Sequence, residues 1–136
     1  MNHRSTGDEG EDLACEYLVK KGFIILERNY EIPFGEIDII ARKKWGLLNF
    51  LRGKNERTIH FVEVKTLSFR NPSFSPEQRV DYKKQQKLRR MAEIWLTKNK
   101  FPQSYPYQID IISVILAPTP KIYFFENAVP DITKPI

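Results

Sequence analysis

Apolar residues recur at helical spacing in two stretches of the chain. Residues 8–21 carry one apolar stripe, Asp8 can cap the start of the helix, and Gly22 follows as a terminator. Residues 77–98 repeat this spacing, and the side chains expected to face the core there are Val80, Leu88, Met91, Ala92, Trp95 and Leu96. The pattern predicts a helix from Asp8 to Lys21 and a longer one from Glu77 to Lys98.

Between and after these helices the pattern favours strands. Runs of apolar and β-branched residues, bounded by Pro, Gly and Asn, predict strands over Phe23–Tyr30, Glu36–Ala41, Thr58–Thr66, Tyr107–Leu116 and Lys121–Glu126. The first two should form a hairpin through Pro33-Phe34-Gly35, whereas residues 42–57 fit neither pattern. The order helix, three strands, helix, two strands favours an α/β fold with a mixed central sheet flanked by helices.

Length and composition narrow the class of protein. With 136 residues, 41% of them apolar, the chain has material for one domain, which we expect to span residues 1–136. No apolar stretch is long enough for a membrane helix, and Met1–Ser5 lacks a secretory pattern, so we expect a cytoplasmic protein with no membrane partner. The lone Cys15 and two histidines exclude a disulfide within the chain and a structural zinc site.

Positive charge is concentrated in two segments. Residues 42–57 and 79–90 each carry six basic side chains against one acidic one, within an overall net charge of +5. Such segments suit a surface that binds a phosphate backbone, and the candidates for nucleic-acid binding are Arg42, Lys43, Lys83, Lys84 and Lys87. The alternative is a solvated helix face with a basic loop.

Charged residues interrupt two apolar strands. Asp38 stands among isoleucines, and an ionised carboxylate there needs a compensating cation or hydrogen bonds. Strand alternation places Glu63 and Lys65 on one face of the central strand. An isolated Glu63–Lys65 ion pair is one interpretation. The other is a magnesium site, with manganese as a substitute, formed by Asp38, Glu63 and the carbonyl of Val64, in which Lys65 stabilises charge on a reacting phosphate.

The two helices add further candidates. Glu11 lies on the sheet-facing stripe of the first helix, where it can serve as a catalytic acid or complete a capping box with Asp8. Lys84 and Gln85, near the start of the second helix, can reach over the carboxylates to a phosphate. Trp45 and Phe50 can stack on unpaired bases, although a hydrophobic flap or a subunit contact in a homodimer explains them more simply.

These motifs resemble those of a nuclease superfamily. Gly10-Glu11, Gly35-Glu36-Ile37-Asp38, Phe61-Val62-Glu63-Val64-Lys65 and Lys84-Gln85 are similar to the motifs of the PD-(D/E)XK nucleases, and within them to the YraN family, which looks like archaeal Holliday-junction resolvases. The resemblance implies a restriction-endonuclease-like core, a magnesium site at Asp38 and Glu63, Lys65 as catalytic lysine and Glu11 as accessory acid. It also matches Gln85 to a helix glutamine, and Asp110 to a late-strand aspartate with a structural role.

Three functions fit these residues and motifs. The first is a magnesium-dependent endonuclease that hydrolyses phosphodiester bonds in DNA, branched or single-stranded. The second is a nucleic-acid-binding protein on the same fold that does not cut. The third is an interaction module that uses residues 45–51 as a protein contact, with structural carboxylates.

Overall fold

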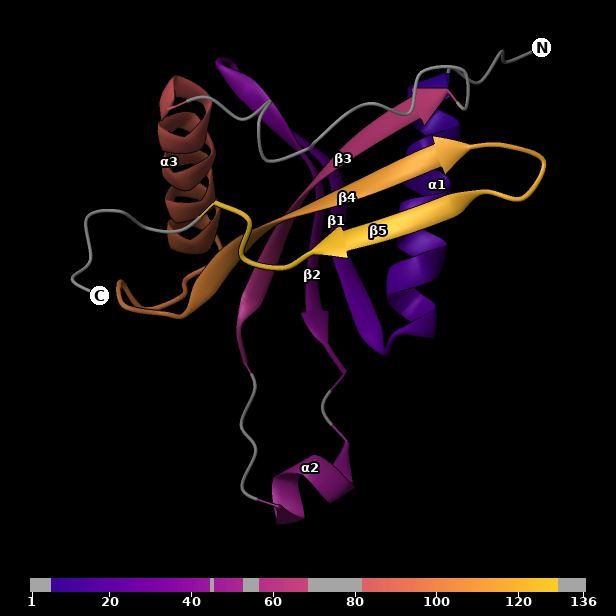
Figure 1. Ribbon diagram of the computed structural model, residues 1–136. Helices are drawn as coiled ribbons and strands as arrows, with labels where there is room; N and C mark the ends of the chain where they lie inside the picture. Colours follow the sequence, from indigo (N-terminus) through magenta and orange to yellow (C-terminus); the bar gives the residue numbers. More distant parts are fainter. Residues whose placement is uncertain (1–5, 45, 53–56, 69–81, 130–136) are drawn as a thin grey trace, which may run out of the picture.

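The computed structural model describes residues 6–44, 46–52, 57–68 and 82–129 (Figure 1). The elements follow in the order α1 (Thr6–Lys20), β1 (Phe23–Ile32), β2 (Gly35–Lys43), α2 (Leu47–Leu51), β3 (Ile59–Ser68), α3 (Tyr82–Lys98), β4 (Tyr107–Leu116) and β5 (Lys121–Phe125). This order confirms the predicted α/β fold with a mixed sheet. None of the described helices is long and apolar enough to cross a membrane.

The strands form one sheet in the order β1-β2-β3-β4-β5. Three of its neighbouring pairs are antiparallel, whereas β3 and β4 run parallel over ten paired positions, from Ile59 with Tyr107 to Ser68 with Leu116. Helix α3 lies in the crossover between these two parallel strands, as such a connection requires. The crossover carries the basic face of α3 to one side of the sheet.

Apolar side chains fill the space on both faces of the sheet. On one face, α3 packs through Leu88, Met91 and Trp95 against a cluster that includes Phe61 and Ile111. On the other, α1 packs through Ala14 and Leu18 against Ile39, Val62 and Ile112. Figure 1 shows the two helices on opposite sides of the strongly twisted sheet. The predicted core residues of the second helix are therefore buried where the structure describes them, and so are Ala14 and Leu18 of the first.

Several element bounds differ from those predicted. Helix α1 begins at Thr6, so Asp8 lies in its first turn rather than at the cap. There its negative charge interacts favourably with the positive end of the helix dipole. The described part of the second predicted helix begins at Tyr82, and Val80 lies outside the described residues. Strands β1 and β3 each extend two residues beyond their predicted ends, to Ile32 and Ser68.

The segment that fitted neither pattern contains a short helix. Strand β2 continues to Lys43, and α2 follows after a short connection. Its side chains Leu47, Leu48 and Leu51 are exposed, and Figure 1 shows α2 projecting away from the sheet. Trp45 and the side chain of Phe50 lie outside the described residues, so base stacking by these two aromatics stays a prediction.

Candidate functional site

Asp38, the first carboxylate of the site, lies where the pairing between β2 and β3 ends. The paired residues of these strands run from Arg42 with Ile59 to Ile39 with Val62, and no pair follows in the direction of Asp38. At this point the Val64 amide donates a hydrogen bond to Asp38 Oδ2 over 2.8 Å. A side-chain oxygen thus accepts the hydrogen bond of a half-buried β3 amide at the point where the paired residues of β2 and β3 end. This contact fixes Asp38 beside β3.

The surroundings of Asp38 disfavour its charge. Burial raises its pKa from 3.8 to about 6, against the opposing effect of the Val64 hydrogen bond, and the negative charges of Glu63, Glu11 and Glu36 add to the rise. A carboxylate with this environment gains from a nearby cation. At pH 7 it is mostly ionised, so it can still act as a ligand.

A second carboxylate, Glu63, is held by two ammonium groups. Its Oε1 atom lies 3.0 Å from Lys65 Nζ and 2.6 Å from Lys84 Nζ. Lys65 comes from the same face of β3, as strand alternation predicted, whereas Lys84 reaches across from the first turn of α3. Burial lowers the pKa of Lys84, but its hydrogen bonds and the charges of Glu63 and Asp38 raise it to a greater extent. The Glu63–Lys65 pair is therefore part of a larger cluster.

Asp38 and Glu63 line one cavity of about 530 Å³. Its walls come from the start of β2, the middle of β3 and the basic face of α3, and its lining residues are Gly35, Glu36, Asp38, Glu63, Lys83, Lys84, Lys87, Leu88 and Met91. Carboxylates and lysines thus share a single concave space. This combination suits a ligand that brings both a cation and an anionic group.

Glu11 lies on the other side of β2 and β3, on α1. It is buried, and Arg28 Nη2 is 3.4 Å from its Oε1 atom and 2.7 Å from Asp12 Oδ1. Burial raises the pKa of Glu11, although the charge and hydrogen bond of Arg28 lower it. Glu11 also helps to raise the pKa of Asp38, although it is not among the described residues that line the cavity. Because α1 begins at Thr6, Asp8 is not its capping residue, which weakens the capping-box interpretation.

Other predicted residues lie away from the cavity or make a different contact. Gln85 is half-buried beside Lys84 but is not among the described lining residues. Arg42 and Lys43 lie at the far end of β2, where Lys43 Nζ is 6.0 Å from the centre of the Phe23 ring. The described contact of Val64 uses its amide, so a role for its carbonyl stays a prediction.

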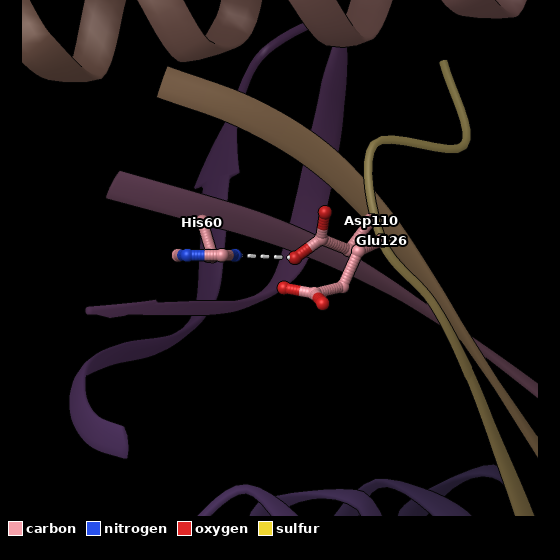
Figure 2. Close-up of side chains that lie close together, drawn as sticks. All are labelled: His60, Asp110 and Glu126. Carbon is pink, nitrogen blue, oxygen red and sulfur yellow. Dashed lines mark hydrogen bonds and ion pairs between the residues drawn. The ribbon is translucent and has the colours of Figure 1, made fainter. Parts of the chain in front are cut away.

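Sequence reasoning missed a buried pair on the opposite face of the sheet from α3. His60 Nδ1 lies 2.6 Å from Asp110 Oδ2, and Figure 2 shows the exposed Glu126 beside them. The other oxygen of Asp110 accepts hydrogen bonds from the Gln108 side chain and the Asn127 amide. The sequence did offer one signal for this pair, namely a polar residue within each of two apolar strands.

The cluster of His60, Asp110 and Glu126 is better described as a structural hydrogen-bond network than as a metal site. Ligand atoms of His60, Asp110 and Glu126 lie within 4.8 Å of one another. However, both oxygens of Asp110 already accept hydrogen bonds, and the unpartnered Nε2 of His60 points away from the carboxylates in Figure 2. The pair joins β3 to β4 and to the residues after β5.

The cavity, by contrast, has a donor set that fits a hard divalent cation. Asp38 and Glu63 offer carboxylate oxygens from neighbouring strands, and Mg²⁺ binds to proteins through one or two carboxylates while keeping several waters. Burial, and after it the charges of the neighbouring carboxylates, raises the pKa of Asp38, so a cation beside it would stabilise its ionised form. The space beside both residues leaves room for the waters.

Comparisons with known proteins point to the same family over most of the chain. Residues 10–114 match the model of a family described as Uncharacterised protein family UPF0102. A UPF0102 protein of Dictyoglomus turgidum is 42% identical over 127 residues, which cover 93% of this chain and 95% of that protein. A UPF0102 protein of Caldanaerobacter subterraneus is 39% identical over 118 residues, which cover 87% and 85% of the two chains.

Proposed function

This chain belongs to Uncharacterised protein family UPF0102, the YraN family that its motifs resemble, and from the chemistry of its cavity we propose that it is a metal-dependent endonuclease acting on DNA. The observation that carries the proposal is the shared cavity, in which Asp38 and Glu63 lie beside three lysines of α3. Carboxylates that hold a cation and ammonium groups that bind phosphate are the two requirements of phosphodiester hydrolysis by this class of enzyme.

The residues divide into two roles. A Mg²⁺ or Mn²⁺ ion bound by Asp38 and Glu63, with the Val64 carbonyl as a third protein ligand, would supply Lewis acidity and a water of lowered pKa. Lys65, held 3.0 Å from Glu63, places a positive charge where negative charge develops on the reacting phosphate. Glu11, from the far side of the two strands, acts as an accessory acid whose charge favours cation binding at Asp38.

The lysines of α3 orient the substrate. Lys83 and Lys87 line the cavity one helical turn apart and are exposed, so both can contact a backbone phosphate without losing much hydration. Arg42 and Lys43 lie four and five residues from Asp38 along β2, which corresponds to roughly 14 and 17 Å. These two residues would contact the same nucleic acid some base pairs away from the reacting bond, which favours a substrate longer than a few nucleotides.

Cleavage and binding must be measured separately to test this proposal. We expect the wild type, with Mg²⁺ or Mn²⁺, to cut at least one of a labelled set of branched, single-stranded and duplex DNAs. Glu63→Gln should lower the cleavage rate by more than about 100-fold without lowering DNA affinity. The matched control is Glu36→Gln, which removes a carboxylate from the exposed rim of the same cavity.

Two outcomes would contradict the proposal. Binding of DNA with no cleavage by the wild type under any metal condition would support the alternative, a nucleic-acid-binding protein that does not cut. Equal loss of cleavage in Glu36→Gln and Glu63→Gln would show that the effect is one of general charge and not of a specific ligand.

A further inference from the structure

One oxygen atom of Glu63 contacts two lysines at once. Lys65 Nζ and Lys84 Nζ lie 3.0 Å and 2.6 Å from the same Oε1. The Glu63 side chain is 13% exposed, so these ammonium groups replace much of the water that would surround the carboxylate. A carboxylate in this position needs positive charge whether or not a metal is bound.

The two lysines differ in how they are held. Lys65 lies on β3, two residues from Glu63 on the same face of the strand. Lys84 belongs to the first described turn of α3, and its side chain is more exposed, at 37% against 25% for Lys65. A lysine ammonium on a flexible four-carbon stem can move several ångströms by changing rotamers. Lys84 can therefore leave Glu63 without any movement of the sheet.

A divalent ion and this ammonium group compete for the same position. Mg²⁺ binds a carboxylate oxygen at about 2.0–2.1 Å, and a second cation close to the same oxygen would be repelled. The negative charge of Asp38 also acts on Lys84, so the ammonium lies within the field of both proposed ligands. Lys84 is in this respect a resident cation of the site.

Resting on the proposed nuclease function, we infer that Lys84 occupies the cation position at Glu63 until a divalent ion displaces it, and that the released ammonium then binds the substrate phosphate. Metal binding and substrate binding are coupled by this exchange, since the ion frees a phosphate ligand. The coupling is reciprocal, so a phosphate that attracts Lys84 also strengthens metal binding.

Calorimetric titration with MnCl₂ alone tests the first half of the inference. We expect Lys84→Gln to bind Mn²⁺ at least about fivefold more tightly than the wild type, because the competing cation is gone. Lys83→Gln is the matched control, since it removes one positive charge from the preceding residue of the same cavity wall. Equal Mn²⁺ affinities of Lys84→Gln and Lys83→Gln, or weaker binding by Lys84→Gln, would overturn the inference.

DNA binding in EDTA tests the second half. Glu63→Gln should release Lys84 and increase affinity for a labelled DNA more than Glu36→Gln does, and the extra gain should disappear in the double variant Glu63→Gln/Lys84→Gln. Equal gains for the two glutamate variants, or a gain that persists in the double variant, would refute the exchange.

The two proposals fail in different ways. Cleavage by the wild type together with unchanged Mn²⁺ affinity in Lys84→Gln would overturn the exchange and leave the nuclease standing. Tighter Mn²⁺ binding by Lys84→Gln in a protein that cuts no DNA would support displacement of Lys84 and overturn the nuclease.

Discussion

The substitution Asp38→Asn should stabilise the metal-free protein, although it removes a proposed catalytic group. Burial raises the pKa of Asp38 from 3.8 to about 6, so the folded state disfavours the ionised carboxylate. Each pKa unit corresponds to about 1.4 kcal/mol, which makes the cost of ionisation at most about 3 kcal/mol. Because Asp38 is only half-buried, solvent reduces this figure, and we expect Asp38→Asn to gain about 1–3 kcal/mol at pH 7.

The pH dependence follows from the direction of the shift. Well below pH 3.8, Asp38 is protonated in the folded and unfolded states, and the variant has no advantage. Between about pH 4 and pH 6 the unfolded state loses its proton first, so wild-type stability falls relative to that of Asp38→Asn. Above about pH 6 the difference in free energy of unfolding between the wild type and Asp38→Asn reaches its full value and no longer changes with pH. The asparagine oxygen can still accept the Val64 hydrogen bond, so little else changes.

Urea unfolding in EDTA at several pH values measures this difference directly. Glu36→Gln serves as control, because Glu36 is exposed at the same cavity, and its stability should stay within about 0.5 kcal/mol of the wild type. Saturating Mn²⁺ should then stabilise the wild type and not Asp38→Asn. Destabilisation by Asp38→Asn at pH 7, or a difference that does not change with pH, would refute the desolvation of Asp38 as the cause.

Two further predictions concern the scaffold, and both can be checked by the same urea titrations. Asp110→Ala leaves three hydrogen-bond donors without their acceptor and should lower the free energy of unfolding by about 3–5 kcal/mol, whereas the exposed Glu126→Gln should change it by less than about 0.5 kcal/mol. Gly10→Ala places a methyl group against the Thr66 side chain and should cost about 1–3 kcal/mol. Gly46→Ala, whose methyl group meets no atom of the described residues within 4 Å, is its control, and equal effects at the two glycines would contradict tight packing at Gly10 as the cause.

The cavity carboxylates Asp38 and Glu63 were predictable because each breaks an apolar pattern. Asp38 interrupts a run of isoleucines, and the two-residue period of a strand brings Glu63 and Lys65 to one face. The structure adds the contact from Lys84, which the position of Lys84 near the helix start suggested only as a reach toward phosphate. The local sequence pattern was therefore enough to predict that these side chains lie together.

The partner of Glu11 could not be predicted, because it depends on an irregularity in β1. The pairing with β2 shifts between Ile25 and Glu27, and such a bulge changes the face on which later residues lie. Glu27 consequently accepts a hydrogen bond from the Trp95 ring of α3, and Arg28 faces α1. Strict alternation from Ile25 would have placed Arg28 on the opposite face.

The His60–Asp110 pair escaped prediction for a different reason. The two residues are 50 positions apart, on strands joined by the α3 crossover, and only the register of the parallel pairing brings them together. Asp110 has a neighbour two residues away, Gln108, that donates to it, but nothing in the local sequence links Asp110 to His60. Long-range register of this kind is set by the packing of α3 and the whole sheet.

The most direct test of the proposed metal site is the position of a bound cation in crystals soaked with Mn²⁺ and measured by anomalous diffraction. We expect a peak in contact with carboxylate oxygens of Asp38 and Glu63, with the Lys84 ammonium moved away from Glu63. No peak at these two residues, or a peak only beside His60, Asp110 and Glu126, would contradict that site.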